Sequence, residues 1–180
     1  MSERSIFRLA AGQSNRDYSS FFVASDVGAM GPAVGDWKEE RDSERGASLT
    51  SRKRSSLDSF SGVKEGDLIL LAVGYRPVTI GRVAKDQVTG KEYNYEPRIG
   101  LFGNWDLFNV IRVKWAPPDN DSVKDALDRL GKQYGPVRLR SSFSGVNVSE
   151  VRECILGLDD RLSREGVWDR ELVDAVFDDE

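Results

Sequence analysis

The sequence predicts an α+β protein: a small mixed β-barrel flanked by helices, with a C-terminal helical segment. In the first two-thirds of the chain, apolar residues alternate or form short runs between glycine-rich turns, which is typical of strands. After Pro117 and Pro118 the apolar spacing changes from two to about 3.6 residues, which is typical of helices. We therefore divide the chain into a barrel, residues 1–118, and a helical extension, residues 119–180, packed on or following the barrel.

Short apolar runs predict the first strands of the barrel, up to residue 85. The segments IFRLA (Ile6–Ala10) and FFVAS (Phe21–Ser25) are rich in β-forming residues, and the glycine-rich segment Val27–Trp37 after them predicts a loop. The continuous run LILLAV (Leu68–Val73) indicates a strand buried on both faces. The run that follows it, Val78–Lys85, alternates in polarity, so the two together predict a hairpin.

Two details of the remaining strands are specific enough to test. Gly81, inside the second hairpin strand, indicates a bulge or the close approach of another group. Residues 103–115 predict the last long strand, in which Trp105 and Trp115 share one face. We expect Trp115 to belong to the core and Arg112, on the other face, to form part of a solvated edge.

The helices are predicted from a spacing of three and four residues between apolar side chains. The stripe Val123, Ala126, Leu127 and Leu130 predicts one of them. Asn147 followed by Glu150 has the form of a capping box. The other expected elements are helices over Ser48–Phe60, Ser149–Leu162 and Asp169–Phe177 and a short strand over Val137–Arg140.

The composition excludes several classes of function. The chain has 180 residues and no histidine, which removes Ser-His-Asp catalysis and most zinc sites. Cys154 is the only cysteine, so no disulfide can form within the chain, and we expect a reducing, cytoplasmic setting. No apolar run approaches the roughly 20 residues that span a bilayer, so no membrane partner is expected.

Sequence motifs do not favour an enzyme. There is no phosphate-binding GxxxxGK[ST] motif and no convincing GxGxxG between a strand and a helix. Asp106 is followed by Arg112-Val113-Lys114, which lacks the second carboxylate of a metal-dependent nuclease. We therefore expect no catalytic residues, no metal and no cofactor.

Aromatic residues gather in predicted loops and at strand ends, among them Trp37, Tyr75, Tyr95 and Trp105. Such rings can stack on a planar base, or they can cap the open end of the barrel core. Trp105 fits both interpretations equally, and its neighbour Asp106 can either accept a hydrogen bond from a base amino group or hold a loop.

Two groups of basic residues are candidates for phosphate contacts. They are the triplet Arg52, Lys53 and Arg54 in the polar segment, and Arg138 with Arg140 on one face of a predicted strand. Phosphate contacts need positive charge near the nucleic acid, although a solvated surface run is the simpler interpretation of either group alone.

Four segments together resemble the PUA-like superfamily, specifically its YTH and EVE modified-base-binding domains. These segments are FRLAAG, VGAMGPAVGDW, GDLILLAVGYRPVTIGRVAKD and NWDLFNVIRVKW, and the likeness covers residues 4–118. It implies a barrel with an aromatic cage that takes a base flipped out of DNA or RNA, a process that costs a few kcal/mol. Trp105 and Asp106 match the aromatic–Asp pair of the family.

The resemblance also departs from the family at one position. YTH domains carry a tryptophan where this chain has Ala29 or Met30, so either Trp37 takes that role or the pocket is built differently. Methylated adenine and modified cytosine both remain open as ligands. The expected pocket is Ala29, Met30, Trp37, Tyr75, Tyr95, Trp105 and Asp106.

The sequence hypothesis is a non-catalytic reader of a modified, methylated base, with DNA favoured over RNA. The resemblance implies the specificity module of a restriction or defence system, partnered by an effector such as a nuclease or NTPase. The alternatives are an RNA-binding PUA-like domain, a metal-dependent enzyme of nucleic-acid metabolism, and a protein-interaction module.

Overall fold

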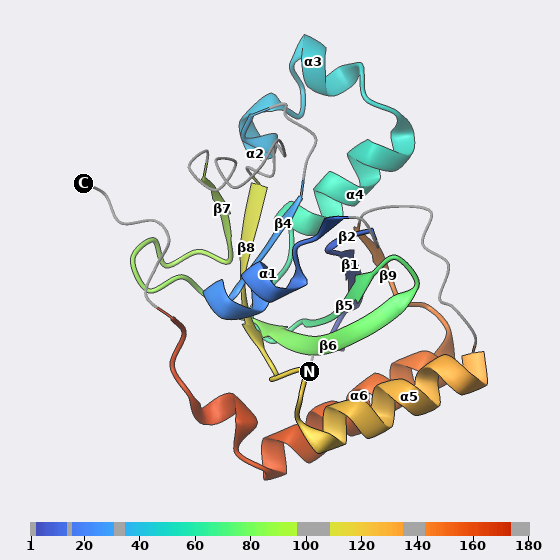
Figure 1. Cartoon of the computed structure of the whole chain (residues 1–180). Helices are drawn as coiled ribbons and strands as arrows, with labels where there is room; N and C mark the ends of the chain where they lie inside the picture. The colour runs from blue at the N-terminus through green and yellow to red at the C-terminus, as the bar shows by residue number, and fades with distance from the viewer. Residues whose placement is uncertain (1–2, 14–15, 31–34, 97–108, 135–142, 174–180) are drawn as a thin grey trace.

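The computed structural model describes residues 3–13, 16–30, 35–96, 109–134 and 143–173. Within them the chain forms an α+β fold (Figure 1). The strands are β1 (Ile6–Ala10), β2 (Gly12–Gln13), β3 (Arg16–Asp17), β4 (Val27–Met30), β5 (Leu68–Val73), β6 (Arg76–Val83), β7 (Tyr93–Tyr95), β8 (Asn109–Trp115) and β9 (Phe143–Gly145). The helices are α1 (Ser19–Ser25), α2 (Trp37–Glu40), α3 (Glu44–Ala47), α4 (Ser51–Ser61), α5 (Asp121–Tyr134), α6 (Ser149–Arg164) and the 3₁₀ turn η2 (Val167–Asp169).

One mixed sheet forms the centre of the fold. Its described strands follow the order β4-β8-β6-β5-β1-β9, and β7 also pairs with β8. β5 pairs parallel with β1 and antiparallel with β6, so the predicted hairpin is confirmed. All six residues of β5 are buried, as its continuous apolar run predicts.

The sheet curls until strands far apart in its order face each other. β4 and β1 are separated by β8, β6 and β5, yet a Cβ atom on Gly28 of β4 would lie 2.7 Å from Cδ2 of Leu9 in β1. Gly81 allows a second close approach, because its Cβ would lie 2.4 Å from Cγ1 of Val113 and 2.6 Å from Cε3 of Trp115. The prediction of close approach at Gly81 is therefore confirmed.

Helix α4 packs against the concave side of the curled sheet. Leu57 and Phe60 of α4 are fully buried in the core formed by this side. The Phe60 ring meets Phe143 of β9 edge-on at a centroid distance of 5.3 Å and Tyr93 of β7 at 6.3 Å. α4 therefore links the β9 edge to the opposite end of the sheet.

Helices α5 and α6 lie side by side and cover the convex side of the sheet (Figure 1). Ile6, Leu68 and Ile80 from the strands share one core with the apolar stripes of both helices. The predicted helices over these two segments are confirmed. β9, which follows α5 in the sequence, pairs antiparallel with β1.

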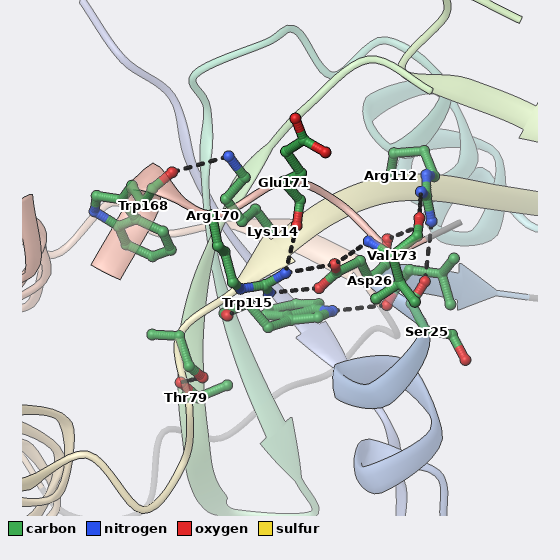
Figure 2. Close-up of polar contacts among 12 residues, drawn as sticks. Ser25, Asp26, Thr79, Arg112, Lys114, Trp115, Trp168, Arg170, Glu171 and Val173 are labelled. Carbon is green, nitrogen blue, oxygen red and sulfur yellow. Dashed lines mark hydrogen bonds and ion pairs between the residues drawn. The ribbon is translucent and has the colours of Figure 1, made fainter. Parts of the chain in front are cut away.

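Part-buried polar contacts hold the segment after α6 against Asp26, just before β4, and against Arg112 of β8 (Figure 2). Arg170 points at Asp26 and donates to both carboxylate oxygens, at 2.7 and 2.6 Å. The Val173 N–H donates to the same carboxylate at 2.9 Å, while its carbonyl accepts from Nη2 of Arg112 at 2.6 Å. We call residues 167–173 the C-terminal strap.

The strap explains why one expectation is wrong. Arg112 is not part of a solvated edge but is 0% exposed. Its Nε lies 3.2 Å from Oδ1 of Asp86, and its Nη1 donates to the carbonyl oxygens of Ser25 and Asp26. Trp115 is buried as expected, and its indole N–H donates to the Val27 carbonyl at 2.8 Å.

Three local predictions also need correction. Phe21–Ser25 is helical, not a strand, because a short apolar run has no decisive period and Phe22 reaches the core from α1. Part of the expected loop Val27–Trp37 is strand β4, which pairs with β8. The capping box at Asn147 does not form. Backbone pairing with Ile6 extends to Val146, and α6 begins after Val148.

The end of the chain departs from the predicted third helix within the part the structure describes. Val167–Asp169 is a 3₁₀ turn, and residues 170–173 are not helical. Val137–Arg140 lies outside the described residues. Among those that are described, no helix is both long and apolar enough to cross a membrane.

Candidate functional site

Three strands meet at Asn109, the first residue of β8. Met30 at the end of β4 and Tyr95 at the end of β7 are both paired with Asn109. Paired residues share a face of the sheet, and Asn109 alternates onto the same face as Ile111. Ile111 pairs with Gly28, the residue that meets Leu9 across the interior. Met30, Tyr95 and Asn109 therefore lie at one end of the concave side.

Asn109 is fully buried and held by polar groups from two other segments. Its side-chain oxygen Oδ1 accepts from the Trp37 backbone N–H at 3.1 Å and contacts the Tyr93 hydroxyl. The same hydroxyl accepts from the Trp37 N–H at 3.1 Å and lies 2.9 Å from Oδ1 of Asp36. Nδ2 of Asn109 is buried, and no described residue accepts a hydrogen bond from it. An amide donor is therefore fixed in position and left open.

The Tyr93 hydroxyl remains protonated under all physiological conditions. Burial, followed by the hydrogen bond to Asp36, raises the pKa of Tyr93 well above its ordinary value. The ammonium group of Lys38 lies 5.4 Å from the centre of the Tyr93 ring. The neutral Tyr93 hydroxyl thus contacts Oδ1 of Asn109 and fixes the orientation of this side chain.

Trp37 supports this cluster from inside the protein. Asp36 caps helix α2 by accepting from the Lys38 N–H, which positions Trp37 at the first turn. The Trp37 side chain is 0% exposed, its indole N–H donates to Asp58 at 2.9 Å, and the Arg54 guanidinium lies 5.9 Å from its ring. The ring expected to stack on a ligand is therefore covered in this structure.

Asp58 connects this tryptophan to the surface. It accepts from Nε of Arg41 at 2.8 Å as well as from the Trp37 indole. Burial alone would raise the pKa of Asp58, but the hydrogen bonds from Arg41 and Trp37 together hold it below its ordinary value. The carboxylate is therefore charged at neutral pH and ties α2 to α4.

Other expected pocket residues lie apart from Asn109. Ala29 is buried on the opposite face of β4, paired with Val110. Tyr75 is 59% exposed in the turn before β6, whereas β6 pairs with β8 only through Gly81–Val83 at its far end. The structure thus brings Met30, Tyr95 and Trp37 together and leaves Ala29 and Tyr75 elsewhere.

The basic triplet divides between two environments on α4. Arg52 and Lys53 are exposed, so their charges face solvent. Arg54 is half-buried and donates to the carbonyl oxygens of Gly46 and Arg41, at 2.9 and 3.3 Å. Arg54 therefore ties α4 to α3 and to the end of α2. Trp105, Asp106, Arg138 and Arg140 lie outside the described residues.

The pocket expected from the sequence did not include Asn109, Tyr93 or Asp36. One signal was present, because Asn109 follows Trp105 by four residues and shares its alternation along the predicted strand. Among the described residues, no group of three or more His, Cys, Asp or Glu side chains could hold a metal ion. The site offers hydrogen bonding and ring contacts.

Comparison with known proteins adds little to this geometry. No family profile matches the sequence, and no curated protein matches it. The fold is similar to the crystal structure of protein Atu2648 from Agrobacterium tumefaciens, with a TM-score of 0.39 and 15% identity over 86% of this chain and 92% of that one. A likeness of this size assigns neither a fold family nor a function.

Proposed function

We propose that this protein is a PUA-like reader that binds a modified base of nucleic acid at the Asn109 end of the concave sheet. The observation that carries the proposal is the buried, unpartnered Nδ2 of Asn109. A buried donor without an acceptor costs about 1–3 kcal/mol, which a ligand acceptor at this position offsets. A base edge offers such acceptors on its carbonyl oxygens and ring nitrogens.

The neighbours of Asn109 supply the other requirements of a base site. Met30 and Tyr95 flank it, one on each adjacent strand, and a thioether and a phenol ring both pack well on a planar ring. Trp105 and Asp106 stand four and three residues before Asn109 in the sequence, and they keep their proposed roles as stacking wall and hydrogen-bond acceptor. Trp37 positions Asn109 rather than stacking itself.

Duplex DNA with a modified base is the proposed ligand, with RNA second, and the exposed Arg52 and Lys53 are the proposed contacts to its phosphates. Their charge is local, because the chain as a whole carries a formal net charge of −4. We further propose that the protein provides the sequence specificity of a restriction or defence system whose effector is a separate domain or subunit.

The experiment compares the affinity for matched oligonucleotides with and without a methylated base at one stated salt concentration. Stacking is worth about 1–3 kcal/mol per base, so Tyr95→Ala should reduce the preference for the modified base by about 5-fold or more. Tyr75→Ala is the matched control, because the same ring is removed from a turn away from Asn109. Equal preferences for wild type and Tyr95→Ala would count against the site.

A further inference from the structure

Two arginines of the sheet are almost completely buried, and their surroundings differ sharply. Arg112 is 0% exposed and has Asp86 at 3.2 Å together with carbonyl oxygens from Ser25, Asp26 and Val173. Arg8 in β1 is 1% exposed and has one acceptor, the Gly74 carbonyl, at 2.6 Å from Nη2. Nε and Nη1 of Arg8 are buried and have no hydrogen-bond partner in the described part of the chain.

No described carboxylate balances the charge of Arg8. Burial lowers the pKa of Arg8 to about 10, and the neighbouring Tyr75 is the group that acts in the opposite direction. The guanidinium therefore stays charged at neutral pH. A buried cation without a counter-ion is strongly destabilising unless an anion reaches it.

On its face of the sheet, Arg8 lies between the large apolar residues Ile6 and Leu70 and the smaller residues Ala10 and Ser144. Arg8 is paired with Leu70 of β5 and Ser144 of β9, and the next residue on its own face is Ala10, paired with Ala72. Ala10 and Ser144, two neighbours of Arg8 on this face, are half-buried and so still contact solvent. Arg8 alternates with Leu9, which packs on the concave side, so the guanidinium lies on the face opposite to that of Asn109.

We propose that Arg8 is the centre of a second binding site, which takes a phosphate group. A guanidinium forms charge-assisted hydrogen bonds to oxyanions, and Arg8 has an open donor on each side of its guanidinium, at Nε and at Nη1. A phosphate presents its oxygens in more directions than a planar carboxylate, so it can accept from an open guanidinium donor and from a neighbouring hydroxyl together. The half-buried Ser144 beside Arg8 is a further donor for the same anion. This site is independent of the base pocket.

The test is the melting temperature of the full chain at pH 7 in increasing inorganic phosphate, with chloride and acetate series at equal ionic strength. Wild type should rise saturably by about 3–6 °C at ten times the dissociation constant, in phosphate only. Arg8→Met should lose this rise, whereas Arg129→Met, the same change at an exposed arginine, should keep it. An equal rise in acetate, or an equal rise in Arg8→Met, overturns the assignment.

The behaviour without phosphate provides a second criterion. Because Arg8→Met removes a buried charge that lacks a counter-ion, the variant should be at least as stable as wild type in phosphate-free buffer. If Arg8→Met does not fold, Arg8→Gln and the ³¹P linewidth of phosphate with wild type replace it. No broadening and no rise in melting temperature would refute the site.

The source of the phosphate group is decided by a further arm with short unmodified DNA. A rise with inorganic phosphate indicates a free phosphate or monoester, while an Arg8-dependent rise with DNA alone indicates a backbone diester. If the ligand is a backbone diester, Arg8→Met should lower the affinity for modified and for plain oligonucleotides by the same factor. If Arg8→Met changed the ratio of the dissociation constants for plain and modified oligonucleotides, Arg8 would not be a phosphate contact. If that ratio were one in wild type, the proposed base reader would be wrong instead.

Discussion

The contact between Arg170 and Asp26 should be the main attachment of the C-terminal strap. Removing the charge with Arg170→Met leaves Asp26, which is 0% exposed, with the Val173 N–H as its remaining strap donor. Breaking a buried ion pair costs about 3–5 kcal/mol. Because the Arg170 side chain is 37% exposed and solvent screens it, we expect a loss nearer 2 kcal/mol.

The assay is urea denaturation followed by tryptophan fluorescence, together with thermal melting. A loss of about 2 kcal/mol corresponds to a fall in melting temperature of roughly 4–8 °C for a chain of this length. Asp26→Asn is the partner variant, since asparagine tolerates the left-handed backbone of Asp26, at φ 50°. The double variant should lose less than the sum of the two single variants. Additive losses, or a loss below about 0.5 kcal/mol in Arg170→Met, would refute this account.

Three further variants test other parts of the fold. Gly81→Ala should lower the free energy of unfolding by about 1–3 kcal/mol in urea denaturation, because its Cβ would lie 2.4 Å from Val113. Gly131→Ala, in α5, should raise it by about 0.5–1 kcal/mol in the same assay, because no described atom lies within 4 Å of the added Cβ. Tyr93 has a raised pKa in the folded state, so wild type should lose stability as pH rises above about 10, where unfolded tyrosine ionises. Between about pH 9 and 11.5 the free energy of unfolding, measured by urea denaturation, should fall less for Tyr93→Phe than for wild type. Equal falls with pH in the two proteins would contradict a buried Tyr93 hydroxyl.

Local patterns predicted much of this fold, and long-range contacts account for what they missed. The apolar run Leu68–Val73 predicts a buried strand and the glycine at position 81 predicts a close approach, and both predictions are confirmed. The burial of Arg112 depends on Asp86 and Val173, which lie 26 and 61 residues away. The spacing of apolar and polar residues along the sequence does not indicate contacts with residues so far away.

In the candidate site too, the residues that the sequence did not predict depend on long-range contacts. Asn109 was not among the residues predicted for the pocket, because nothing in the sequence shows that Tyr93 and the Trp37 backbone bind its side chain. Likewise, Trp37 stands beside glycine and proline residues typical of an exposed loop. Its burial results from the capping of α2 by Asp36 and the packing of α2 against α4.

The central claim is that the open amide of Asn109 reads a modified base. The most direct test is the ratio of dissociation constants for plain and methylated oligonucleotides, measured for wild type and for Asn109→Asp at one salt concentration. Asp keeps the acceptor that holds Trp37 and Tyr93 but removes the Nδ2 donor, so we predict that the ratio falls by about 10-fold or more. A folded Asn109→Asp variant with the wild-type ratio, or a wild-type ratio of one, would contradict the claim.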